Sequence, residues 1–167
     1  MTEPNRQGEV WVFAEQESGA LHDVSLELCG KARELADRLG VKAGAVLPGA
    51  GVGEMAKRLI SHGIDNVYLV DHPRLSHYQT LPYAKVLETL IEKHRPQICI
   101  VGATAIGRDL APRVASTLRA GLTADCTDLD ISDVTDPKTE VEHKNLLLQI
   151  RPAFGGNIIA TIVNYDQ

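Results

Sequence analysis

Apolar runs alternate with helical patterns along the first 120 residues. Four apolar runs predict strands, over 10–14, 41–47, 67–70 and 98–102. The continuous run at 10–14 indicates a strand buried on both faces, and 98–102 is the clearest buried strand. Four segments with apolar residues at helical spacing predict helices, one ending at Leu39 and the others over 53–62, 81–94 and 110–118. This rhythm predicts an α/β fold: a doubly wound, mostly parallel sheet with helices on both faces.

Capping residues predict where these helices begin and end. Asp23 or Ser25 is expected to cap the first helix, and Gly40 to end it. Thr80 is expected to cap the third helix, with Pro82 in its first turn. Asp109 is expected to cap the fourth.

The pattern changes after residue 121. Residues 122–131 form a short, mixed and acidic stretch, and 133–140 read as a polar turn. Apolar runs at 146–150 and 158–163 then predict two strands, with a Gly-Gly-Asn turn between them. We therefore expect a C-terminal antiparallel hairpin that completes the sheet.

Composition narrows the function class. A chain of 167 residues predicts one domain, or two at most, and its 17 basic and 22 acidic side chains give a net charge of −5. This charge disfavours nucleic-acid binding, and no apolar run is long enough for membrane insertion. Three distant cysteines predict neither a disulfide framework nor a metal site, and the start has no signal pattern, so we expect a cytoplasmic protein.

Two loops between strands and helices are candidate anion sites. The glycines of 48–53, with Asp71 after the next strand, imitate a dinucleotide-binding turn, but Glu54 stands where a phosphate would approach. We therefore favour a simple turn there. Residues 102–109 could hold an anion through backbone N–H groups and Arg108; alternatively, Asp109 caps the helix and pairs with Arg108 or Arg113.

No catalytic constellation emerges from the remaining polar residues. The six histidines are scattered, and no nucleophile-elbow motif is present. Cys126 lies beside Asp125 and Asp128, and neighbouring carboxylates raise the pKa of a thiol, which disfavours a reactive thiolate. We expect no catalytic residues and no metal ligands.

Several longer motifs resemble the N-terminal domain of the electron transfer flavoprotein alpha subunit. They are DHPRLSHY at 71–78, GATAIGRDLAPRVA at 102–115, AGLTADCT at 120–127 and RPAFGGNI at 151–158. Their order and spacing fit that family over nearly the whole chain. The polar start predicts disorder over 1–8. The resemblance implies the N-terminal domain over 9–167, with an adenine nucleotide alpha hydrolase-like fold. The motifs of the family's FAD-binding C-terminal domain are absent from this sequence, so we expect this chain to be a fragment; the alternative is a natural short form.

The resemblance also implies a function. Family members are heterodimers of alpha and beta subunits that carry electrons on FAD. They accept electrons from acyl-CoA dehydrogenase-type enzymes, as in fatty acid β-oxidation, and pass them to a quinone oxidoreductase or take part in bifurcation. This domain would then be a scaffold and docking surface for the beta subunit, binding FAD weakly or not at all.

Candidates for the docking surface lie in loops beside the strand ends. They are Arg108, Arg113, Thr123, Asp125, Arg151, Phe154, Gly155, Gly156 and Asn157. The plain alternative for each arginine is pairing within the domain. Two other functions remain open: an AMP- or ATP-binding module of the universal-stress-protein type, and a Rossmann dehydrogenase fragment.

Overall fold

The computed structural model describes residues 5–17, 19–153 and 158–165. Its first part is a parallel sheet in the order β5-β4-β1-β6. These strands are β1 (Val10–Phe13), β4 (Ala43–Gly49), β5 (Asn66–Asp71) and β6 (Ile98–Ile100). A small antiparallel pair, β2 (Gln16–Glu17) and β3 (Ala20–Leu21), follows β1.

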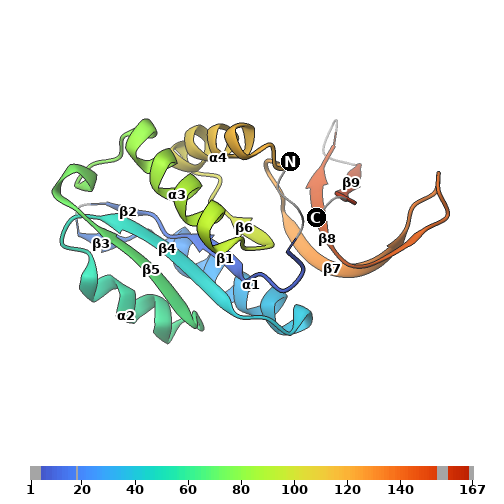
Figure 1. The fold of residues 1–167 in the computed structure, drawn as a ribbon, viewed down its shortest axis with the longest axis horizontal. Coiled ribbons are helices and arrows are strands. Elements are labelled where there is room, and N and C mark those ends of the chain that lie inside the picture. Colours follow the sequence, from blue (N-terminus) through green and yellow to red (C-terminus); the bar gives the residue numbers. More distant parts are fainter. Residues whose placement is uncertain (1–4, 18, 154–157, 166–167) are drawn as a thin grey trace.

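Two helices cover each face of the parallel sheet (Figure 1). On one face lie α1 (Asp23–Leu39) and α2 (Gly53–Ser61); on the other lie α3 (Thr80–His94) and α4 (Ala105–Leu118). A short 3-10 turn, η1 (Pro73–Leu75), precedes α3. The central strand β1 is at most 1% exposed at every position, as its continuous apolar run predicts. The doubly wound α/β prediction is confirmed.

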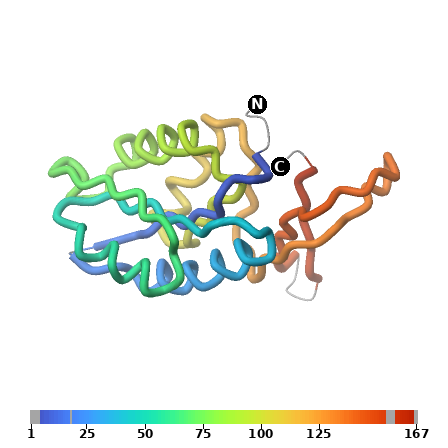
Figure 2. The backbone as a smooth tube through the Cα atoms, turned by 60° about the horizontal axis from the view of Figure 1, so that its bottom comes forward, coloured from blue at the N-terminus to red at the C-terminus, as the bar shows by residue number. Residues whose placement is uncertain are grey.

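The C-terminal strands form a separate sheet. β7 (Asp128–Thr135), β8 (Glu142–Pro152) and β9 (Ile159–Ile162) pair antiparallel in that order. This sheet extends from the helical layers as an arm (Figures 1 and 2). The predicted hairpin exists as β8 and β9, but it does not complete the parallel sheet. β7 contains the end of the acidic stretch, residues 128–131, and the start of the expected polar turn, residues 133–135.

Helix α1 anchors the second sheet. Lys31 Nζ lies 3.3 Å from an Asp128 carboxylate oxygen, and Arg38 pairs with Asp130. Arg38 also donates to the Ile131 carbonyl at 2.9 Å. Ile131 and Leu147 are buried in the core under α1. Asp128 and Asp130 therefore pair with basic side chains of α1, which explains why this part of the strand is acidic.

The ends of the helices differ from the predicted caps in three places. His22, not Asp23 or Ser25, caps α1 by accepting from the Val24 N–H, and Gln79 precedes α3. Helix α4 begins at Ala105 with Thr104 as its cap, so Asp109 lies inside the helix. The predicted stop at Gly40 is confirmed: its φ of 68° is left-handed, and its N–H donates to the carbonyls of the last turn.

Residues 5–8 contact residues 95–97, the segment just before β6. Asn5 donates to the Arg95 carbonyl at 2.7 Å, and Gly8 is buried against this segment. Residues 1–4 lie outside the described part, and the boundary between residues 8 and 9 stays a prediction. None of the described helices is long and apolar enough to cross a membrane.

Candidate functional site

The first anion-binding candidate, the turn before α2, is filled by a side chain of the domain itself. Asp71 ends β5 beside this turn, because Gly49 and Asp71 are partners in the β4–β5 ladder. Its carboxylate accepts the Gly51 N–H at 2.8 Å and the Val52 N–H at 3.2 Å. These are the donors that a nucleotide phosphate would need. The geometry therefore agrees with a simple turn rather than a dinucleotide site.

The second candidate lies where β1 and β6 end side by side. Glu15 follows β1 and is 4% exposed, and its carboxylate lies 2.8 Å from the Thr104 hydroxyl. Burial raises the pKa of Glu15, while the Thr104 hydrogen bond and nearby His22 lower it. Thr104 also accepts the Gly107 N–H at 3.0 Å. A carboxyl group thus occupies the crevice where doubly wound folds bind phosphates, which disfavours a nucleotide there.

Gly107 explains the close packing of this loop. A Cβ at position 107 would collide with the carbonyl oxygen of Gly102, so only glycine lets α4 approach the end of β6 this closely. A Cβ at Gly102 would in turn meet Val24 at 3.0 Å and Glu15 at 3.2 Å. The GATAIG motif is therefore explained by packing between strand and helix.

Arg108 and Asp125 are brought together across the surface. Arg108 Nη2 lies 2.8 Å from Asp125 Oδ1, and Arg108 Nε donates to the Ala103 carbonyl at 3.1 Å. This pair joins the first turn of α4 to residues 119–127, which we call the connecting segment. Both side chains are exposed, at 60% and 45%, so the pair contributes about 0–1 kcal/mol of stability and its charges remain accessible.

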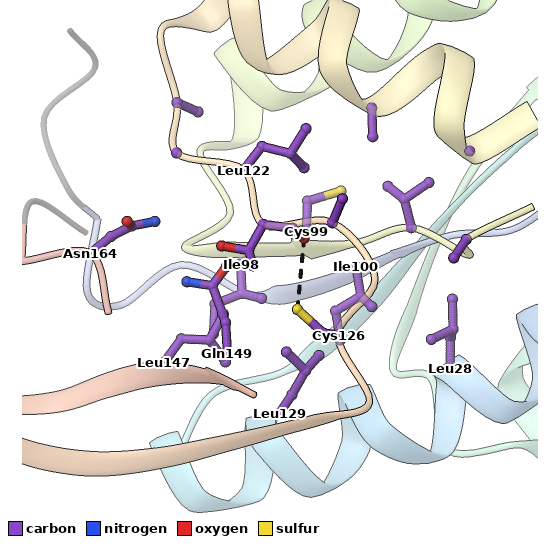
Figure 3. A pocket seen from close by; sticks show the side chains of 18 of the residues that line it. Leu28, Ile98, Cys99, Ile100, Leu122, Cys126, Leu129, Leu147, Gln149 and Asn164 are labelled. Atoms are coloured by element: carbon purple, nitrogen blue, oxygen red, sulfur yellow. Dashed lines mark hydrogen bonds between the residues drawn. The ribbon is translucent and has the colours of Figure 1, made fainter. Parts of the chain in front are cut away.

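Thr123 belongs to the connecting segment, and Arg151 lies close enough for its charge to act on Cys126 of that segment. Cys126 Sγ donates to the Thr123 carbonyl at 3.7 Å (Figure 3). Burial raises the pKa of Cys126; the charge of Arg151 lowers it, and Asp125 raises it. The predicted direction for this thiol is confirmed, with burial as the larger cause. Four of the candidates therefore gather around the connecting segment.

The other candidates lie elsewhere. Arg113 is exposed on α4, where its charge acts on Tyr78 and Asp109. Phe154, Gly155, Gly156 and Asn157 lie outside the described residues. Within the parts of the chain that the structure describes, no group of three His, Cys, Asp or Glu side chains could hold a metal.

Sequence reasoning missed a latch between α3 and α4. Asp109 was expected to cap α4 and to pair with Arg108 or Arg113. Instead its carboxylate accepts the Tyr78 hydroxyl at 2.5 Å and the Thr80 hydroxyl at 2.6 Å. The correction has a simple reason: Thr104 begins the helix a full turn earlier, which leaves Asp109 facing the residues before α3.

The latch makes stability depend on pH. The hydrogen bonds from Thr80 and Tyr78 lower the pKa of Asp109 below its ordinary value. Because the folded pKa is depressed, the stabilisation is present above about pH 4 and is lost as the pH falls through the folded value. We expect Asp109→Asn to lower the free energy of unfolding at pH 7, and the difference from the parent to shrink below about pH 4.

Denaturant titrations at several pH values check this. The exposed carboxylate Glu92 on α3 offers a matched control, and Glu92→Gln should leave the pH dependence as in the parent. A constant difference between parent and Asp109→Asn across the acid range would contradict the latch.

Comparison with known proteins gives a family. Residues 10–167 match the electron transfer flavoprotein domain. The chain is 52% identical over 158 residues to the electron transfer flavoprotein subunit alpha of Thermoanaerobacterium thermosaccharolyticum, covering 95% of this chain and 45% of that protein. It is 53% identical over 157 residues to the protein of that name from Clostridium acetobutylicum, covering 94% and 44%.

A third relative belongs to an enzyme complex. The chain is 48% identical over 154 residues to the lactate dehydrogenase (NAD(+),ferredoxin) subunit LctC of Acetobacterium woodii, covering 92% of this chain and 34% of that protein. The chain therefore spans less than half the length of these curated relatives.

Proposed function

This chain belongs to the electron transfer flavoprotein family, as the N-terminal domain of an alpha-type subunit, and from that membership we propose that it is a non-catalytic half of an electron carrier. The observation that carries the proposal is about 50% identity to alpha subunits over nearly the whole chain. In the complete protein, FAD would carry electrons from an acyl-CoA dehydrogenase-type donor to a quinone oxidoreductase or another acceptor.

The described residues do not fit a flavin site. FAD carries a pyrophosphate, which needs free N–H donors at a helix N-terminus or a cationic clamp. Asp71 takes the donors before α2, and the Glu15 carboxyl lies beside those before α4. We therefore derive no step through the flavin in this domain and place the FAD site in the remainder of the protein.

The role that we propose for this domain is to dock a beta subunit in the cytoplasm. Arg108, Asp125 and Arg151 supply both signs of charge around the connecting segment. Such complementary charges steer association and fix orientation between subunits. The match to a subunit of a lactate dehydrogenase complex shows that relatives of this domain also serve in larger assemblies.

Co-purification with a beta subunit tests the function. The complete alpha subunit should bind a beta subunit and retain flavin, and Arg151→Ala should raise the Kd between subunits by about tenfold, equivalent to 1.4 kcal/mol. Arg58→Ala, an exposed arginine on α2, is the matched control and should leave the Kd unchanged.

Two failures can be told apart. A parent protein that neither binds a beta subunit nor holds flavin would overturn the electron-carrier function. A different result is a parent that assembles, together with an Arg151→Ala protein that binds the beta subunit with the same Kd and retains the same amount of flavin. That result would overturn only the role of this arginine.

A further inference from the structure

The backbone of Glu15 ties the end of β1 to the start of α1. Its N–H donates to the Ser25 hydroxyl at 2.8 Å. Its carbonyl accepts the His22 N–H at 3.0 Å and the Ser25 hydroxyl at 3.2 Å. Ser25 is fully buried, and Glu15 is 4% exposed. The first turn of α1 therefore holds the backbone of Glu15 in place.

The side chain of Glu15 reaches across to the start of α4. Both carboxyl oxygens lie 2.8 Å from the Thr104 hydroxyl. That hydroxyl accepts the Gly107 N–H at 3.0 Å, and the Thr104 carbonyl accepts the Arg108 N–H at 2.9 Å. A Cβ on Gly102 would come within 3.2 Å of Glu15 Oε1, so the carboxyl group packs against the loop between β6 and α4. Glu15 thus links the first turns of two helices that cover opposite faces of the sheet (Figure 1).

Few groups compensate a negative charge at this position. Among the described residues, the Thr104 hydroxyl is the one hydrogen-bond donor to the carboxyl group. From α1, His22 is the side chain whose charge acts on Glu15, and Val24 is apolar. The loop before α4 supplies Thr104 and Gly102, which carry no charge. A buried carboxylate is normally paired with a cation or accepts several hydrogen bonds, so an ionised Glu15 lacks the partners that it would have in water.

The balance of these effects favours the neutral acid. The Thr104 hydrogen bond and the charge of His22 lower the pKa of Glu15, but burial is the larger cause, and the pKa is raised. The stabilisation by the neutral group is therefore present in full below the ordinary value, about pH 4.5, and is lost as the pH rises through the folded value. This dependence has the opposite sign to that of the Asp109 latch.

We propose that Glu15 is a proton-dependent clasp for the first turn of α4. The neutral carboxyl group holds Thr104 where the structure has it, and ionisation draws water into the junction and loosens the turn. Arg108 lies in this turn, and its Nε–H donates to the Ala103 carbonyl beside Thr104. Loosening would therefore change how Arg108 faces Asp125 and a beta subunit. That last step rests on the proposed docking function, whereas the clasp itself does not.

Glu15→Gln tests the clasp in the 167-residue chain by urea titration. The glutamine keeps an oxygen that accepts from Thr104 and cannot ionise, so it imitates the neutral acid. At pH 7 the folded-to-unfolded ratio should be several-fold higher than in the parent, and the two proteins should converge as the pH falls toward about 4.5. Glu17→Gln, which removes a nearby exposed carboxylate on β2, is the matched control and should leave the pH dependence as in the parent.

Nuclear magnetic resonance locates the effect at the start of α4. In the parent, the Gly107 amide signal should move with a midpoint above about pH 4.5, because its acceptor is the hydroxyl that binds Glu15. The Arg108 Nε–H signal should follow the same midpoint. Both transitions should be absent in Glu15→Gln. The Val41 N–H donates to the Ala36 carbonyl at the other end of α1, and its signal should not move in either protein.

Two further variants assign the proton to Glu15. Thr104→Val removes the hydroxyl and should lower the folded-to-unfolded ratio more at pH 7 than at about pH 4.5, because a hydroxyl binds an ionised carboxylate more strongly. Thr104→Ser keeps the hydroxyl and should behave as the parent does. His22→Asn keeps a side chain that can cap α1, and the loss of the imidazole charge should move the Gly107 midpoint upward.

Three results would overturn the clasp. One is a stability difference between Glu15→Gln and the parent that is the same at pH 7 and at about pH 4.5. Another is a Gly107 midpoint that persists in Glu15→Gln or disappears in His22→Asn, which would assign the proton to another group. The third is equal movement of the Gly107 and Val41 signals, which would indicate a change in the whole domain. None of these measurements involves a beta subunit, so their failure would leave the proposed function standing.

Discussion

Gly107→Ala is expected to destabilise the domain by about 1–3 kcal/mol or more, as overpacking of a dense interior does. A methyl group there would overlap the Gly102 carbonyl oxygen and press on Val101 at 3.0 Å. The first obstacle is backbone, so the end of β6 or the start of α4 must shift. Since Thr104 links this helix start to Glu15, the shift should also disturb that hydrogen bond.

Urea titration followed by circular dichroism measures this loss. Gly30→Ala is the matched control, because Gly30 lies inside α1 and has no atom near its would-be Cβ. That substitution should stabilise the domain by about 0.5–1 kcal/mol through helix propensity. Equal stabilities for Gly107→Ala and its parent would show that the loop is looser than the structure has it.

Trp11→Ala is expected to cost about 3–5 kcal/mol, the usual loss for a buried aromatic residue. Trp11 is fully buried in β1, and its indole packs against Tyr68 with ring centroids 4.4 Å apart. Its Nε1 donates to Glu9 at 2.7 Å. The same carboxylate accepts from Asn66 and Tyr68 of β5, so the loss would weaken the side-chain contacts that link Glu9 and Trp11 to β5 across β4.

Thermal unfolding checks this second effect. For a chain of this length, each kcal/mol lowers the Tm by about 2–4 °C. Leu81→Ala, at a position that is 70% exposed, should change stability by no more than about 0.5 kcal/mol. A Trp11→Ala protein that unfolds within a degree of its parent would contradict the packing described for β1.

The parallel part of the fold could be predicted because the local sequence of each strand and helix shows its apolar pattern and where it ends. Residues 10–13 and 98–100 are apolar throughout, as strands covered on both faces must be. Left-handed Gly40 ends α1 where the apolar spacing stops. The strand predicted over 41–47 stops before Pro48, but β4 continues through Gly49, because β1 ends opposite Val46 and leaves Pro48 paired with β5 alone.

The second sheet could not be predicted in the same way. β7 is half-exposed and acidic, and it has the composition of a loop until its pairing with β8 and its contacts with α1 are known. Those partners are about 20 residues away in β8 and about 100 residues away in α1. Nothing local distinguishes Asp128 and Asp130, bound by α1, from the aspartates of a turn.

The candidate site was predicted in part. Arg108 was expected to bind an anion or to pair with Asp109, and its actual partner, Asp125, lies 17 residues away in the connecting segment. The carboxylates of Asp71 and Glu15 disfavour phosphate binding at the two loops, because each lies where a phosphate would bind. Their positions depend on the three-dimensional fold and could not be predicted from the sequence. The docking role of Arg151 stays a prediction.

The carboxylate of Asp71 has a consequence for how the domain responds to its surroundings. A protein that binds a metabolite in its native state gains stability as that metabolite accumulates. Here the carboxylate of Asp71 already accepts the N–H groups before α2, so we expect ATP or AMP to gain no binding site and add no stability at this turn. The order of this turn should then depend on the ionisation of Asp71 rather than on the concentration of a bound metabolite.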